Sequence, residues 1–208
     1  ALVLKDRKSL NQADYRKLVS GRSTGFGSSL LRLLLGIPAC FYSLVIRLRN
    51  LLYSKGWFKA HRVNAAVISI GNITAGGTGK TPLVIWFCRF LQNKNIPCAV
   101  LTRGYKTHTR ERETGDERRE TKIDEPAILA ESCPEAKVII NPDRIAAATE
   151  AINKAGAKVL IMDDGFQHRR LARELDIVTI DATLPFGYGR LLPAGLLREP
   201  LYSLKRAD

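Results

Sequence analysis

One segment of the sequence has the residue types and spacing of a phosphate-binding loop. Residues 71–81 read GNITAGGTGKT, which follows the pattern G-x-x-x-x-G-K-[ST] except that Thr74 occupies the first glycine position. Glycines let the backbone turn its N–H groups onto phosphate oxygens, and the helix expected to follow adds positive potential. We expect Lys80 to reach the β- and γ-phosphates of a nucleoside triphosphate and the Thr81 hydroxyl to bind Mg²⁺. The predicted nucleotide-binding residues are Thr74, Ala75, Gly76, Gly77, Thr78, Gly79, Lys80 and Thr81.

Two adjacent aspartates form the second group of residues suited to chemistry. Asp163 and Asp164 directly follow the apolar run VLIM at residues 159–162. A phosphate loop usually needs an acid on a neighbouring strand to hold Mg²⁺. We therefore predict that Thr81, Asp163 and Asp164 are metal ligands. The alternative is that one of the two aspartates caps the turn before Gly165.

Apolar runs and helical patterns alternate around these two motifs. We expect strands at residues 65–70, 98–101, 138–140, 159–162 and 177–180, and helices at residues 82–91, 125–131 and 143–155. Strands separated by helices favour a mainly parallel sheet covered on both faces. The sequence therefore predicts an α/β, P-loop NTPase-like fold. Both motifs would lie at the carboxyl ends of strands, where open sheets of this class bind ligands.

The N-terminal part has a different composition. Residues 1–25 are polar and predict a loosely ordered arm, whereas residues 33–46 are uncharged and largely apolar, with Arg32 before them and Arg47 and Arg49 after them. This run is shorter than a membrane-spanning helix requires, and Pro38 is expected to kink or begin a helix. Two interpretations remain: a helix at a membrane interface, or a helix packed on the rest of the domain. The predicted domains are residues 1–60, the arm and this helix, and residues 61–208, the core.

Charge and cysteine content narrow the classes of function. Lys and Arg number 33 against 20 Asp and Glu, a net charge of +13, which favours an anionic partner such as a nucleotide, a nucleic acid or a membrane surface. The four cysteines have no metal-ligand spacing and are expected to be buried thiols.

A nucleic-acid-dependent ATPase is disfavoured because the aromatic residues cluster in the apolar N-terminal part. A P-loop GTPase or metal-insertion chaperone, which uses the loop as a switch, remains the main alternative, although no N-K-x-D motif occurs.

Several segments together resemble the tetraacyldisaccharide 4′-kinase family. They are HRVNAAVISIGNITAGGTGKTPLV (61–84), TRGY (102–105), DEPAILA (124–130), NPDR (141–144), DDGFQH (163–168), LLPAGLLREPLYSLKRAD (191–208) and the basic-apolar stretch RLRNLLYSKG (47–56). Threonine at the first loop position is itself usual in that family. The resemblance implies a kinase that transfers phosphate from ATP, with Mg²⁺, to a lipid A precursor at the cytoplasmic face of the bacterial inner membrane. It favours the membrane-associated helix and implies no nucleic-acid partner. We also expect the chain to be the front part of a longer protein.

The resemblance also implies roles for individual residues. Asp124 would take the proton from the sugar hydroxyl, with Asp116 as the weaker alternative; Ile123 stands where relatives usually have glycine, and Asp124 could also cap the helix that follows. Lys80, Arg103 and His168 would join Asp124 in catalysis. A further family histidine that assists the base has no counterpart within these residues. The substrate-binding residues implied by the resemblance are Tyr105, Glu125, Gln167, Arg198 and Glu199.

Overall fold

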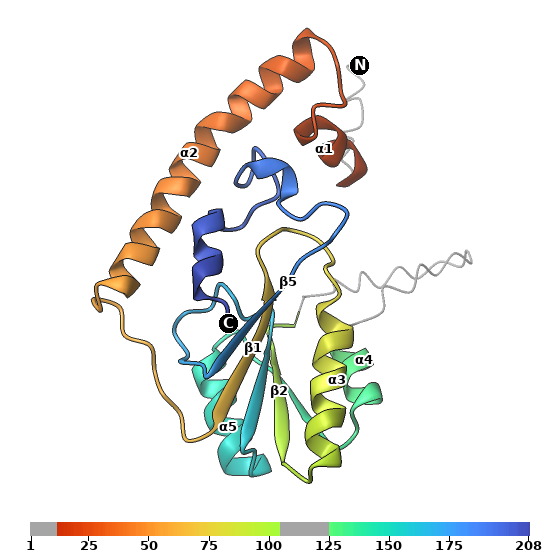
Figure 1. Ribbon diagram of the computed structural model, residues 1–208, viewed down its shortest axis with the longest axis vertical. Coiled ribbons are helices and arrows are strands. Elements are labelled where there is room, and N and C mark those ends of the chain that lie inside the picture. The colour runs from red at the N-terminus through yellow and green to blue at the C-terminus, as the bar shows by residue number, and fades with distance from the viewer. Residues whose placement is uncertain (1–11, 105–124) are drawn as a thin grey trace, which may run out of the picture.

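A parallel sheet lies at the centre of the structure, a computed structural model that describes residues 12–104 and 125–208 (Figure 1). Within these residues its strands are β1 (Ala66–Asn72), β2 (Cys98–Thr102), β3 (Lys137–Ile140), β4 (Val159–Asp163) and β5 (Leu175–Thr179). The spatial order is β3-β2-β4-β1-β5, and every pair of neighbours runs parallel. The strands β1, β2 and β4 are largely buried, as expected for strands covered on both faces.

Helices cover both faces of the sheet, which confirms the predicted fold class. Helices α3 (Lys80–Asn93) and α4 (Glu125–Ser132) lie on one face, and α5 (Arg144–Ala155) lies on the other. The core on the α3 side includes Val84 and Leu129, while the core on the α5 side is built around alanines that let the helix approach the sheet closely. Asp143 caps α5 by accepting hydrogen bonds from two backbone N–H groups of its first turn.

The strand order creates a binding crevice between β1 and β4. These two strands are neighbours, with Ile70 opposite Asp163. The chain leaves β1 toward β2 on one side and leaves β4 toward β5 on the other. Loops that depart in opposite directions leave a crevice at the carboxyl ends of the strands, which is where open α/β sheets bind ligands. The phosphate loop and the aspartate pair therefore meet at this crevice, as the sequence predicted.

The N-terminal part forms two helices, α1 (Gln12–Val19) and α2 (Phe26–Ser54). The expectation of a loosely ordered arm is wrong for α1, because Leu18 and Val19 are buried. Helix α2 continues through Pro38 rather than starting or breaking there. It extends along one side of the molecule (Figure 1), and by length and composition it could cross a membrane. It also carries Cys40, which is exposed; the expectation of a buried thiol is wrong there because Cys40 faces an open groove between α2 and the C-terminal segment rather than the core.

The C-terminal segment returns across the end of the sheet. It contains two short 3-10 helices, η1 (Gly187–Gly189) and η2 (Leu201–Arg206). Beyond η2, the Asp208 backbone N–H donates to the Asp176 carbonyl, and the Asp208 carboxylate accepts from the Asp176 N–H at 2.8 Å. The segment thus binds the β5 edge of the sheet at one end and, through residues 187–198, reaches the phosphate loop.

Candidate active site

The phosphate loop keeps its shape through hydrogen bonds from both flanking strands. Gly79 adopts the left-handed conformation, with a φ of 76°, where the loop enters α3, a conformation that favours glycine. The Asn72 side-chain amide donates to the Gly76 carbonyl at 3.1 Å. The Gln167 amide, which follows β4, donates to the Asn72 carbonyl at 2.7 Å, and on the β5 side Thr179 contacts the Thr78 hydroxyl at 2.8 Å. The loop is therefore fixed at both ends by hydrogen bonds to the strands around it.

Thr74, the departure from the general loop pattern, is buried against the C-terminal segment. It forms an antiparallel bridge with Leu197, and the neighbouring Ala75 N–H donates to the Leu196 carbonyl at 2.7 Å. A Cβ at Gly187 would lie only 3.2 Å from the Thr74 methyl group. The threonine side chain thus fills space between the loop and residues 187–197, a contact that a glycine at this position would lack.

Asp164 forms ion pairs with two basic residues beside the phosphate loop. Its carboxylate contacts Lys80 Nζ at 3.5 Å and Arg198 Nη1 at 2.8 Å. Burial alone would raise the pKa of Asp164, but the charges and hydrogen bonds of Arg198 and Lys80 outweigh burial and hold that pKa below its ordinary value. Asp164 is therefore ionised at neutral pH, and it holds the loop lysine in place.

Asp163 lies deeper in the crevice and is buried. Its carboxylate accepts a long hydrogen bond of 3.5 Å from the Thr102 hydroxyl, at the end of β2. Its carbonyl accepts from Arg144 Nη2 at 3.1 Å. Arg144 is itself buried at the start of α5, and this burial lowers its pKa. Sequence reasoning did not select Arg144, although the NPDR segment that contains it contributed to the family resemblance.

A cavity of about 640 Å³ connects these groups. Among the residues predicted as functional, Gly76, Gly77, Lys80, Arg103, Asp163, Asp164, Gln167, His168 and Arg198 line it. Helix α2 contributes Tyr42, Ile46 and Arg49 to the same wall, and the Tyr42 hydroxyl donates to the Arg198 carbonyl at 2.8 Å. The sequence carried no signal for these three residues, because it does not reveal how a helix far from the loop in the chain is oriented.

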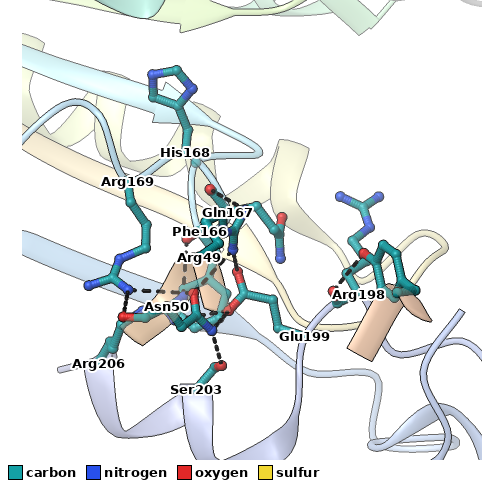
Figure 2. Close-up of polar contacts among 12 residues, drawn as sticks. Arg49, Asn50, Phe166, Gln167, His168, Arg169, Arg198, Glu199, Ser203 and Arg206 are labelled. Atoms are coloured by element: carbon teal, nitrogen blue, oxygen red, sulfur yellow. Dashed lines mark hydrogen bonds and ion pairs between the residues drawn. The ribbon is translucent and has the colours of Figure 1, made fainter. Parts of the chain in front are cut away.

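The adjacent residues Arg198 and Glu199 have different surroundings. Figure 2 shows Glu199 directed toward Arg49 and Asn50 of α2, and Arg198 directed away from them. Glu199 is fully buried, and it pairs with Arg49 at 2.7 Å and with Arg206 at 2.9 Å, while the Asn50 amide donates to it at 3.2 Å. Arg198 thus belongs to the cavity wall, whereas Glu199 fastens α2 to the C-terminal segment and is not among the cavity-lining residues.

His168 lies in the cavity wall as a neutral imidazole. Burial lowers its pKa to about 4, and the nearby charge of Arg144 adds to this effect. Its Nε2 atom is buried without a hydrogen-bond partner among the described residues.

Asp124, the predicted base, and Tyr105 lie outside the described residues, as does the alternative Asp116. Glu125 begins α4.

The oxygen groups beside the loop suit a magnesium ion that is also held by phosphate. Thr81 lies in the first turn of α3, next to Lys80, and Asp163 and Asp164 line the cavity. Mg²⁺ in such sites takes one or two carboxylates together with nucleotide phosphates and water. Within the described ranges, no group of three or more His, Cys, Asp or Glu side chains could hold a metal by itself. The residues therefore fit a cation that arrives with a nucleotide.

Comparison with known proteins identifies one family. A family model described as LpxK, tetraacyldisaccharide-1-P 4′-kinase, matches residues 31–208. A curated tetraacyldisaccharide 4′-kinase from Geobacter sulfurreducens is 43% identical over 209 aligned residues, which cover 93% of this chain and 57% of the relative. One from Elusimicrobium minutum is 44% identical and covers 80% of this chain and 47% of the relative. The chain thus spans about half the length of the curated relatives it matches.

A solved structure supports the same relationship. The crystal structure of LpxK from Aquifex aeolicus in complex with ATP matches with a TM-score of 0.71 and 37% sequence identity. The match covers 86% of this chain and 57% of that chain. The solved structure therefore shares the overall fold of this chain.

Proposed function

The chain belongs to the tetraacyldisaccharide-1-P 4′-kinase family, and from this premise we propose that the protein transfers the γ-phosphate of ATP to the 4′-hydroxyl of a tetraacyldisaccharide 1-phosphate in lipid A biosynthesis. The observation that carries the proposal is the meeting of Lys80 and Asp164 at the crevice, 3.5 Å apart. A phosphate loop without an acid on the adjacent strand would bind an anion but would lack a group to orient Mg²⁺.

The predicted site residues have different parts in the proposed reaction. Lys80 exchanges its contact with Asp164 for contacts with the β- and γ-phosphates. Thr81, Asp163 and Asp164 would hold Mg²⁺, which would neutralise phosphate charge. Arg103 and Arg198 line the cavity, and their guanidinium groups suit planar contacts with phosphate oxygens. His168, neutral at pH 7, is a hydrogen-bonding group rather than a cation. Asp124 remains the proposed base.

The remaining predicted substrate-binding residues keep that proposed role. Tyr105 and Glu125 flank the segment that contains Asp124 in the sequence. Gln167 lines the cavity while it also holds the loop. For Glu199 we propose an indirect contribution, because its carboxylate orients Arg49, which itself lines the cavity. The alternative of a GTPase or metal-insertion chaperone is not favoured, because the matching curated relatives are named as kinases.

The assay that tests this function uses the intact protein, Mg²⁺ and γ-labelled ATP with a detergent-dispersed lipid disaccharide 1-phosphate. Label should appear on the lipid, and Lys80→Ala should abolish both transfer and ATP binding. Asp124→Ala should abolish transfer but keep ATP binding, whereas Asp116→Ala, the same change at the weaker candidate for the base, should be active. Robust transfer to nucleosides with none to the lipid would refute the proposal, and an active Asp124→Ala enzyme would move the base to another residue.

The proposed location is the cytoplasmic face of the bacterial inner membrane, with an anionic membrane surface as partner and no nucleic acid. Helix α2 supports this location because its apolar residues, including Phe41 and Leu44, are exposed. We expect wild-type protein to float with anionic liposomes and the double variant Phe41→Glu, Leu44→Glu to sediment. The conservative pair Phe41→Leu, Leu44→Met is the control. Flotation of the glutamate variant would mean that α2 does not make the contact.

A further inference from the structure

Helix α1, which precedes the residues that the family model matches, brings an arginine to the phosphate loop. The match begins at residue 31, whereas α1 covers Gln12–Val19. Figure 1 shows α1 at the end of the sheet where β1 leads into the loop. Nothing in the sequence of residues 12–19 resembles a nucleotide-binding motif, so the placement is known only from the fold.

Helix α1 is docked at this position by specific contacts. The Tyr15 hydroxyl lies 2.8 Å from the Pro193 carbonyl and 3.0 Å from the Gly195 carbonyl, and Leu18 and Val19 are buried. The residues that receive Tyr15 belong to the same segment that bridges to the phosphate loop, since the next residue, Leu196, accepts from the Ala75 N–H. Helix α1 and the phosphate loop therefore both form hydrogen bonds with residues 193–196 of the C-terminal segment.

Arg16 follows Tyr15, and its guanidinium lies against the loop. A Cβ built on Gly76 would lie 3.0 Å from Arg16 Nη2. Hydrogen bonds from Thr183 lower the pKa of Asp181, which follows β5, and the charge of Arg16 adds to this lowering. Arg16 is therefore beside the loop at Gly76, and its charge also acts on Asp181. Across the described ranges, no carboxylate lies close enough to form an ion pair with Arg16.

The part of the loop that Arg16 approaches is the part expected to border the γ-phosphate. Gly76 lines the same cavity as Lys80, Asp164 and Arg198, and the loop lysine reaches the β- and γ-phosphates. We propose that Arg16 is a further catalytic residue, an arginine finger supplied within the same chain by helix α1, whose guanidinium binds the γ-phosphate of the nucleotide. This inference rests on the proposed kinase function.

The chemical role of Arg16 is to neutralise charge, not to transfer a proton. In the proposed reaction the acceptor oxygen bonds to the γ-phosphorus while the bond from that phosphorus to the β,γ-bridging oxygen breaks. The hydroxyl proton passes to the base, and ADP leaves with the electron pair of the broken bond. Arginine stays protonated throughout, and its planar donors suit the equatorial oxygens on which charge is spread in this transition state.

The test compares ATP and ADP binding to the intact protein by isothermal titration calorimetry, beside single-turnover transfer rates. Arg16→Ala should weaken ATP binding roughly tenfold or more, as expected for a charge-assisted hydrogen bond to phosphate, and should change ADP binding by less than about twofold. The transfer rate should fall roughly tenfold to hundredfold. Lys17→Ala removes the same charge from the next residue of α1 and is the matched control, with no change expected in any of these values.

The two proposals fail in different ways. Wild-type ATP affinity in Arg16→Ala, beside weakened binding in Lys80→Ala, would overturn the role of Arg16 alone. Equal losses for ATP and ADP, or an equal loss in Lys17→Ala, would also overturn it, because either result indicates a general charge effect rather than a γ-phosphate contact. Unchanged ATP binding in Lys80→Ala would overturn the proposed function and this inference together.

Discussion

Replacement of Glu199 by glutamine tests how α2 is held against the rest of the protein. Glu199 is fully buried, and its two carboxylate oxygens receive Arg49 at 2.7 Å and Arg206 at 2.9 Å. Glutamine keeps the size of the side chain but removes the charge. Arg49 comes from α2 and Arg206 from η2, so this substitution leaves two guanidinium groups facing a neutral amide at the junction of the two elements.

The magnitude follows from the burial of the three groups. Removing one partner of a buried ion pair costs about 3–5 kcal/mol. The side chains of Arg49 and Arg206 are 28% and 22% exposed to solvent, so water can partly solvate their charges. We therefore expect a loss of unfolding free energy at the lower end of this range, about 3 kcal/mol. At about 2–4 °C per kcal/mol for a domain of this size, the unfolding midpoint should fall by roughly 6–12 °C.

Thermal unfolding by circular dichroism at pH 7 measures this effect, and its pH dependence identifies the cause. Burial acts to raise the pKa of Glu199, but Arg206, Arg49 and Asn50 outweigh burial and lower it overall. The stabilisation is therefore complete above the unfolded-state pKa, about 4.3, and is lost as the pH falls through the lower folded-state pKa. The difference between wild type and Glu199→Gln should shrink in that acidic range.

A matched control is available on the surface of α5. Glu150 pairs with Lys154 at 3.4 Å, and both side chains are exposed, so Glu150→Gln should change stability by less than about 0.5 kcal/mol. Two results would refute the reasoning: a Glu199→Gln protein as stable as the control, or a stability difference that persists unchanged at pH 3.

Three further predictions concern groups around the phosphate loop. Gly71→Ala should destabilise the protein by about 1–3 kcal/mol, because the new Cβ would lie 2.6 Å from the backbone nitrogen of Phe166; Gly77→Ala, which has open space around it, is the control in the same denaturant titration. His168, with its pKa lowered to about 4, should remain neutral by NMR titration until about pH 4. The folded state therefore loses stability as the pH falls from about 6.5 to 4, and His168→Gln should reduce this loss; an imidazole that titrates near pH 6.5 would contradict the prediction. Gln167→Ala should weaken ATP binding by up to roughly tenfold in calorimetry, because one carbonyl at the start of the loop loses its 2.7 Å hydrogen bond; unchanged affinity would show that the loop holds its shape without it.

Local sequence patterns predicted the core of this fold well. The phosphate loop, the apolar strands and the helix beginning near Pro82 depend on interactions within a few residues, such as the left-handed turn at Gly79. Strand boundaries shifted by only one or two residues, as in β5, which begins at Leu175. A phosphate loop usually needs an acid on a neighbouring strand, and the strand that ends at Asp163 does pair with β1.

The local sequence patterns did not predict contacts between segments that are distant in the chain. Residues 1–25 look like a polar arm, yet Tyr15 bonds to carbonyls about 180 positions away. Likewise, the family resemblance implied a substrate contact for Glu199, while the fold shows a buried carboxylate shared by two arginines. Neither residue has a local signature, because its partners are assembled only when the C-terminal segment packs against α1 and α2.

The sequence by itself therefore determined the nucleotide-binding loop, the acid pair and the class of fold, because short-range hydrogen bonding and the alternation of apolar and helical patterns are written in neighbouring residues. Only the tertiary structure decided that α2 walls the cavity, that Arg198 faces it while Glu199 does not, and that α1 carries Arg16 to Gly76. The physical reason is that the orientation of a helix depends on packing and buried charge pairs formed with remote residues, and these form together when the chain folds.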